Sequence, residues 1–95
     1  MVSFIVRLKF APEDRALIAE TLRLMATATR QEPGCVSFIP HHLESDPETV
    51  LIYEQYRDPE AQAAHRETAH FQKYIAGVVY KKMLDRSRED LAALV

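Results

Sequence analysis

Residues 35–56 read CVSFIPHHLESDPETVLIYEQY and contain two runs that are typical of β-strands. The runs are Cys35–Leu43 and Val50–Tyr56, and both are rich in the β-branched and aromatic residues that favour a pleated, half-buried surface. The segment between them contains Asp46-Pro47, a pair that favours a turn over a continued strand. This stretch predicts a β-hairpin in the middle of the chain.

Upstream of the hairpin the sequence predicts a strand over residues 2–10 and a helix over residues 12–31. In the strand, apolar residues recur with period two, which places them on one face. They are Val2, Phe4, Val6, Leu8 and Phe10. The helix would begin at Pro12, because proline at the first helical position loses no needed N–H, and it would end before Pro33-Gly34.

Downstream of the hairpin, Asp58-Pro59 predicts the start of a second helical stretch, with a break near Thr68. Residues 84–95 suit either a charged helix or a fourth strand, with the apolar end over residues 91–95 expected to be buried. The order of elements indicates an α+β fold of the ferredoxin-like βαββαβ type, formed by residues 1–95 as a single domain.

Composition excludes several kinds of partner. The 95 residues carry 14 acidic and 12 basic side chains for a net charge of −2, so no basic field attracts nucleic acid. No apolar stretch is long enough to cross a membrane. Cys35 is the single cysteine and cannot form an internal disulfide, and no signal peptide is recognisable at the N-terminus, so a cytoplasmic protein is expected.

The face of the sheet that points away from the helices is expected to carry several apolar side chains. They are Ile5, Ile39, Leu51 and Tyr53. A patch of this kind is unfavourable in water, so a second copy of the chain is expected to cover it in a homodimer.

Four local patterns, taken together, resemble the antibiotic biosynthesis monooxygenase family. They are Glu32-Pro33-Gly34-Cys35 followed by Phe38, the Asp46-Pro47 hairpin, Glu54-Gln55-Tyr56-Arg57-Asp58, and Ala64-His65 followed by Thr68-Ala69-His70-Phe71. The resemblance implies a dimeric α+β barrel with a pocket in each subunit, between the sheet and its helices.

The family that the chain resembles includes cofactor-independent oxygenases acting on quinols and polycyclic phenols, haem-degrading enzymes, and an isomerase of a phosphorylated signal sugar. The haem-degrading branch fits poorly, because the chain has no tryptophan, its first strand has no asparagine, Tyr56 stands at the tryptophan position and Ile75 at the haem-binding histidine position. The resemblance therefore implies a cofactor-independent monooxygenase, an oxidoreductase acting on a quinol or another aromatic or polyphenolic molecule. An isomerase and a non-catalytic small-molecule-binding protein are the alternatives.

An oxygenase of this type needs a base, since the deprotonated quinol passes an electron to dioxygen more readily than the neutral one. His70 is the first candidate, and Tyr74 lies one turn later on the same face. Glu54 would orient His65 or His70, or would serve only as a buried structural partner. His65 is a further catalytic candidate, with a satisfied core histidine as its structural alternative.

Aromatic and polar side chains at several positions could contact a flat substrate. The candidates are Phe38, His42, Tyr56, Phe71 and Tyr74. No cofactor is expected, because the chain has no glycine-rich phosphate loop. No metal site is expected either, because the helical rotation between His65 and His70 is about 140°, far from the i, i+4 pairing of a two-histidine site.

Overall fold

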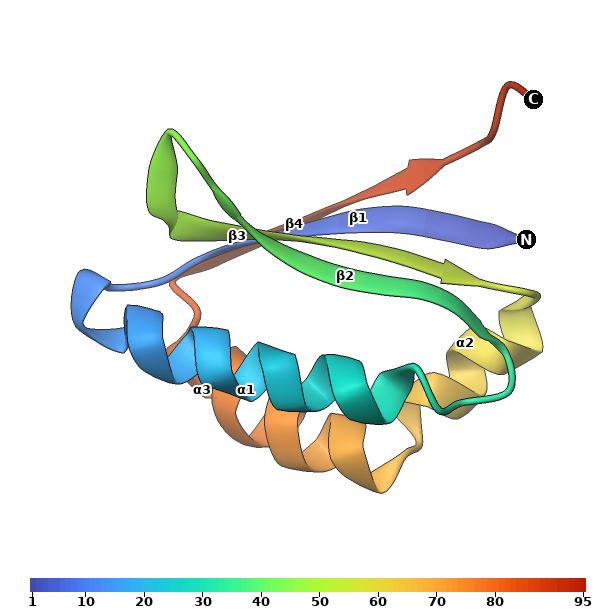
Figure 1. Ribbon diagram of the computed structural model, residues 1–95, viewed down its shortest axis with the longest axis horizontal. Coiled ribbons are helices and arrows are strands. Elements are labelled where there is room, and N and C mark those ends of the chain that lie inside the picture. The colour runs from blue at the N-terminus through green and yellow to red at the C-terminus, as the bar shows by residue number, and fades with distance from the viewer.

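Four antiparallel strands form one sheet in the order β2-β3-β1-β4 in the computed structural model, which describes residues 1–95 (Figure 1). The strands are β1 (Val2–Lys9), β2 (Cys35–Leu43), β3 (Asp46–Tyr56) and β4 (Asp85–Leu91). The helical segments are the 3₁₀ turn η1 (Pro12–Asp14), α1 (Arg15–Thr29), α2 (Pro59–Arg66), the π-helix η2 (Phe71–Val79) and α3 (Tyr80–Lys82). The predicted ferredoxin-like α+β fold is confirmed.

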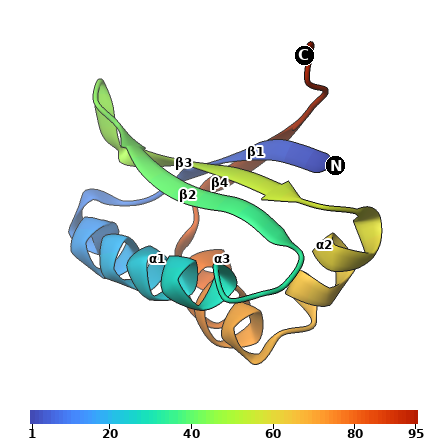
Figure 2. The same ribbon diagram turned by 45° about the vertical axis from the view of Figure 1, so that its right-hand side comes forward.

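All helices lie on one side of the sheet, as two views show (Figures 1 and 2). The predicted alternation in β1 is confirmed, because Phe4, Val6 and Leu8 are buried beneath the helices. The buried side chains of α1 recur at helical spacing and meet this face of the sheet. They are Ile18, Thr21, Leu22, Met25, Ala26 and Thr29.

The central hairpin is confirmed but is longer than the apolar run predicted. β3 begins at Asp46, which pairs with Leu43, so the turn itself contains only Glu44 and Ser45. The Asp46 carboxylate accepts a hydrogen bond from the Thr49 hydroxyl at 2.6 Å, which stabilises the polar start of the strand. Strand propensity missed this extension because the first residues of β3 are polar or proline.

The final segment is an edge strand. β4 pairs with β1 from Lys9↔Asp85 to Ser3↔Leu91, so the strand alternative for this part of the chain holds. The expectation that residues 91–95 are buried is wrong in the single chain, where Leu91 is 43% exposed and Val95 is fully exposed. Nothing packs over this end of the edge strand.

No helix is long and apolar enough to span a bilayer.

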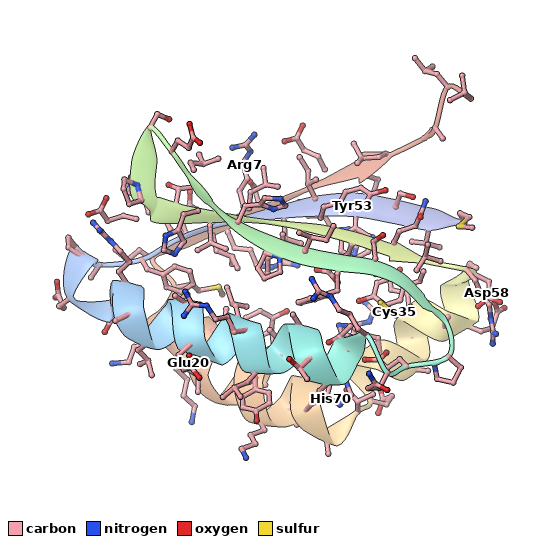
Figure 3. The ribbon with its side chains drawn as sticks, in the orientation of Figure 1. Arg7, Glu20, Cys35, Tyr53, Asp58 and His70 are labelled. Atoms are coloured by element: carbon pink, nitrogen blue, oxygen red, sulfur yellow. The ribbon has the colours of Figure 1, made fainter.

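The side of the sheet opposite the helices carries the expected apolar patch. Ile39, Tyr53 and Ile5 lie side by side in register across β2, β3 and β1. Ile39 is 41% exposed, and Tyr53 and Arg7 lie on this open side in Figure 3.

Candidate functional site

A cavity of about 100 Å³ lies between the sheet and the helical layer. Its walls are mostly apolar and come from β1, β2, β3 and η2, with Phe38 and Phe71 among them. Six polar or charged side chains also line it: Glu54, Gln62, His65, Arg66, Arg86 and Arg88. A small apolar cavity with a few polar groups is the usual form of a small-molecule site.

The start of α2 positions His65 against the sheet. The Asp58 carboxylate accepts a hydrogen bond from the Ala61 N–H at 2.7 Å, and Pro59 occupies the first turn, as the sequence predicted. Helical spacing then places His65 in the last turn of α2, where its residue surface is only 3% exposed. Its ring centroid lies 5.0 Å from that of Tyr56.

The helical stretch breaks after α2, as predicted near Thr68. The Thr68 hydroxyl donates to the His65 carbonyl at 2.7 Å and accepts from the Phe71 N–H at 3.1 Å, so it stabilises both the end of α2 and the start of the next segment. This break turns His70 back toward His65, with 6.4 Å between the ring centroids. The prediction that these two histidines diverge is wrong, because it assumed one continuous helix.

Both histidines meet the same carboxylate oxygen. Oε2 of Glu32 lies 2.9 Å from Nδ1 of His65 and 2.6 Å from Nε2 of His70. An ionised carboxylate only accepts hydrogen bonds, so with Glu32 ionised both of these ring nitrogens carry hydrogen. In neutral His65 the other nitrogen, Nε2, is then a free acceptor.

Gly34 brings Glu32 close to α2. A Cβ on Gly34 would overlap the Cβ of Ala61, so only glycine allows this approach. The Gly34 carbonyl accepts a hydrogen bond from the Arg57 N–H at 3.0 Å, which fixes the turn to the end of β3. The Glu32-Pro33-Gly34 turn thus places the Glu32 carboxylate against α2, within reach of His65.

Glu54 is a buried carboxylate near the end of β3, next to His65. The Tyr56 hydroxyl donates to Glu54 Oε1 at 2.7 Å, and His65 Nε2 lies 3.8 Å from the same oxygen. Loss of hydration raises the pKa of Glu54 to about 7, against the opposing effects of the Tyr56 hydrogen bond and the charges of Arg88 and Arg86.

Burial also acts on the two neighbours of Glu54. It lowers the pKa of His65, although the hydrogen bond and charge of Glu32 oppose this effect. It raises the pKa of Tyr56 far above its ordinary value, so the phenol remains a hydrogen-bond donor. His65 is therefore neutral near pH 7 and able to accept a proton.

Four of the eight residues proposed from the sequence line the cavity: Phe38, Glu54, His65 and Phe71. The other four lie outside its lining. His70 lies behind Glu32, Tyr56 is fully buried beneath Glu54, and Tyr74 packs against the core cluster. His42 is exposed and lies near the outer part of α1, where it lines a separate surface hollow with Arg23.

Glu32, Arg86 and Arg88 belong to the site but were not predicted from the sequence. Glu32 was noted only as part of the Glu32-Pro33-Gly34 turn. Its two histidine partners come from a later part of the chain, so no local pattern indicates the contact. Arg86 and Arg88 are two residues apart. In a strand this spacing places both side chains on the same face, so it could have indicated that they act together.

Glu32, His65 and His70 are also the residues that could hold a metal ion. Their donor atoms lie within 4.8 Å of one another, and two imidazoles with one carboxylate form a known ligand set for transition metals. A metal would have to replace the two short hydrogen bonds to Glu32. The sequence-based expectation of a metal-free site stays a prediction.

Fold and site together define a small ferredoxin-like domain with a largely apolar cavity that holds an imidazole and a buried carboxylate. Residues 1–77 match the family model described as antibiotic biosynthesis monooxygenase. The chain belongs to this family, which confirms the resemblance noted in its sequence.

Individual relatives agree with this assignment. A protein of Mycobacterium tuberculosis named "Putative monooxygenase Rv0793" is 35% identical over 77 residues, which are 81% of this chain and 75% of that protein. The solved structure of Rv0793 has a TM-score of 0.87 at 28% identity, covering 99% of this chain and 95% of that one. A structure from Nitrosomonas europaea, described as "Putative antibiotic biosynthesis monooxygenase", has a TM-score of 0.92 at 26% identity with both chains fully covered.

Proposed function

We propose that the protein is a cofactor-independent monooxygenase that acts on a quinol or a related phenol, with His65 as the base that faces the substrate. One observation carries the proposal. The Nδ1–H of His65 is held by Glu32 at 2.9 Å, its Nε2 lies 3.8 Å from Glu54 Oε1, and the residue lines a mostly apolar cavity. A base oriented by a second group is the arrangement that proton abstraction requires.

The reaction needs no external reductant. A substrate hydroxyl gives its proton to His65, and the resulting anion passes an electron to dioxygen. One oxygen atom ends on the ring, the other leaves as water, and the quinol, which becomes a hydroxyquinone, supplies the electrons. Apolar walls favour this chemistry by keeping water away from the intermediates.

His70 keeps a role in this scheme, although it does not line the cavity. The exposed fraction of the side chains rises from 4% at His65 to 13% at Glu32 and 22% at His70. The three groups thus form a hydrogen-bonded chain from the cavity to the surface. Glu32 stabilises the imidazolium that forms on His65, and His70 exchanges protons with solvent.

We further propose that the working form is a homodimer. Ile5, Ile39 and Tyr53 form an apolar row in register across β1, β2 and β3. Tyr53 lies on the side of the sheet that no helix covers (Figure 3). A second copy of the chain, packed sheet to sheet, would bury this row.

Oxygen consumption by metal-stripped protein tests the proposed activity. A panel of quinols and small phenols is supplied in air and again under argon. We expect uptake of oxygen with formation of an oxygenated product. Product formed equally under argon would instead indicate an isomerase, and binding without turnover would indicate a ligand-binding protein.

A further inference from the structure

The edge strand β4 carries arginines on the side of the sheet that the other strands use for the core. Arg88 pairs in register with Val6 and Arg86 with Leu8, both of which are buried under the helices. Side chains in register point to the same face, and both arginines line the cavity. A strand that served only the core would carry apolar residues at these positions.

The cavity is positively charged in a protein that is negatively charged overall. Its lining includes three arginines, Arg66, Arg86 and Arg88, and one carboxylate, Glu54, which leaves an excess of two positive charges when histidine is counted as neutral. The whole chain carries a net charge of −2. Basic side chains therefore outnumber acidic ones in the lining of the cavity, where a ligand would bind.

The arginines of β4 differ in how far they are already engaged. Arg88 forms an ion pair with Asp90, with Nη2 at 2.8 Å and Nε at 2.9 Å from Oδ1, and its guanidinium lies 3.8 Å from the centre of the Phe4 ring. Arg86 has no carboxylate within 4.0 Å, and its guanidinium lies 6.0 Å from the centre of the Tyr80 ring. Of the two arginines of β4, Arg86 is therefore the one whose guanidinium is free to bind an anion.

The two arginines of β4 line the same cavity as Glu54 and His65. The charges of Arg88 and Arg86 oppose the rise in the pKa of Glu54 that burial causes. In the sheet, β4 with its arginines and β3 with Glu54 lie on opposite sides of β1. A ligand with an acidic group and a hydroxyl could contact both.

The size of the cavity sets the size of the ligand. Its volume of about 100 Å³ is comparable to the roughly 150 Å³ of an engineered protein cavity that accepts benzene. One aromatic ring matches this space better than a polycyclic system.

We propose that the substrate is a single-ring hydroxyaromatic carboxylate, whose carboxylate binds Arg86 while its hydroxyl faces His65. This inference rests on the proposed function and adds the class of substrate and the residue that selects it. Arginine suits the role, because its planar guanidinium can bind both oxygens of a carboxylate at once. The competing explanation is that the arginine stems only cover the apolar edge of the sheet, which predicts no preference for acidic ligands.

Equilibrium binding under argon tests the inference without requiring turnover. Gentisate, a quinol with a carboxylate, is compared by calorimetry with methylhydroquinone, in which a methyl group replaces the carboxylate. We expect gentisate to bind at least about tenfold more tightly to the unaltered protein, because a hydrogen bond to a charged group is lost in the neutral ligand. Arg86→Gln should remove this preference, and Arg86→Lys should restore part of it.

Arg23→Gln is the matched control, since it removes one exposed arginine from the outer surface of α1 and should leave the preference unchanged. Thermal melting checks that each variant is folded. Equal affinity for the two ligands, no binding of gentisate, or an unchanged preference in Arg86→Gln would each overturn the inference. A preference that depends on Arg86, without oxygen uptake in air, would contradict the proposed function and leave the carboxylate site intact.

Discussion

His65 and Glu32 are 33 residues apart in the sequence, yet Nδ1 of the imidazole lies 2.9 Å from Oε2 of the carboxylate. The contact joins the turn before β2 to the last turn of α2, beside the cavity. It fixes the orientation of the ring and leaves the opposite nitrogen free. Several measurable properties depend on it.

Substitution of Glu32 by Gln should lower the pKa of His65 further. Both the charge and the hydrogen bond of Glu32 raise this pKa against the effect of burial, and the amide removes the charge. The measurement is an NMR titration of the histidine ring signals. Glu20→Gln, an exposed change on α1, is the control and should leave the titration of His65 unaltered. A higher pKa of His65 in Glu32→Gln would contradict the assigned interaction.

Glu54→Gln should be more stable than the unaltered protein at high pH and should lose this advantage at low pH. The pKa of Glu54 is about 7 in the folded state against an ordinary value of 4.5, so the folded state holds its proton more tightly. The contribution of Glu54 to the free energy of unfolding is therefore fully present below pH 4.5 and is lost as the pH rises through about 7. Glutamine can still accept the hydrogen bond from Tyr56.

Urea unfolding at about pH 5 and about pH 8 measures this effect, with a difference between the two proteins of at most about 3 kcal/mol. His65 contributes the opposite trend, because its lowered pKa makes stability fall as the pH drops below its ordinary value of 6.5. That trend is present in both proteins, so it cancels in the comparison. The same difference in stability at both pH values would show that Glu54 titrates normally.

Gly34→Ala should destabilise the fold by about 1–3 kcal/mol, the usual cost of overpacking. The added methyl group would overlap the Cβ of Ala61. Ala61→Gly removes that atom and alone should cost up to about 1 kcal/mol through helix propensity. In the double variant part of the loss should be recovered, and chemical denaturation of all four proteins measures the coupling. Purely additive losses would mean that the two residues are not in tight contact.

Much of the fold could be predicted from local patterns, and the exceptions have physical causes. Apolar residues alternate in β1 and recur at helical spacing in α1, and each pattern indicates that one face is buried. Phe4 and Leu22 were therefore assigned to the core correctly. β4 was ambiguous because an exposed edge strand need not bury alternate residues, and charged side chains such as Arg86 weaken the strand signal.

The site was only partly predictable, because it depends on contacts between distant segments. Glu54 and His65 were recognised from their places in a strand and a helix, and both line the cavity. His65 and His70 lie close together because the helix breaks at Thr68. The break was predicted from the sequence, but the direction of the chain after it was not. The role of Glu32 follows from the close docking of Gly34 on α2, a tertiary contact that no local pattern reports.

Tyr53→Lys should convert the proposed dimer into a folded monomer. Tyr53 lies at the centre of the apolar row on the open side of the sheet, where a buried charge would be unfavourable (Figure 3). Sedimentation analysis reports the mass, and circular dichroism reports the fold. Leu24→Lys is the control, because Leu24 is 45% exposed on α1, away from this face. A monomeric unaltered protein would contradict the proposed dimer.

The most direct test of the central claim compares the rates of oxygen uptake of His65→Asn and His70→Asn with that of the unaltered protein, using a quinol that the protein accepts. Loss of a general base costs roughly 100-fold or more, and we expect a loss of this size for His65→Asn. For His70→Asn we expect a smaller loss, because His70 contacts Glu32 and does not line the cavity. A large loss in His70→Asn with little change in His65→Asn would contradict the account and make His70 the base, and unchanged rates in both would place the base elsewhere.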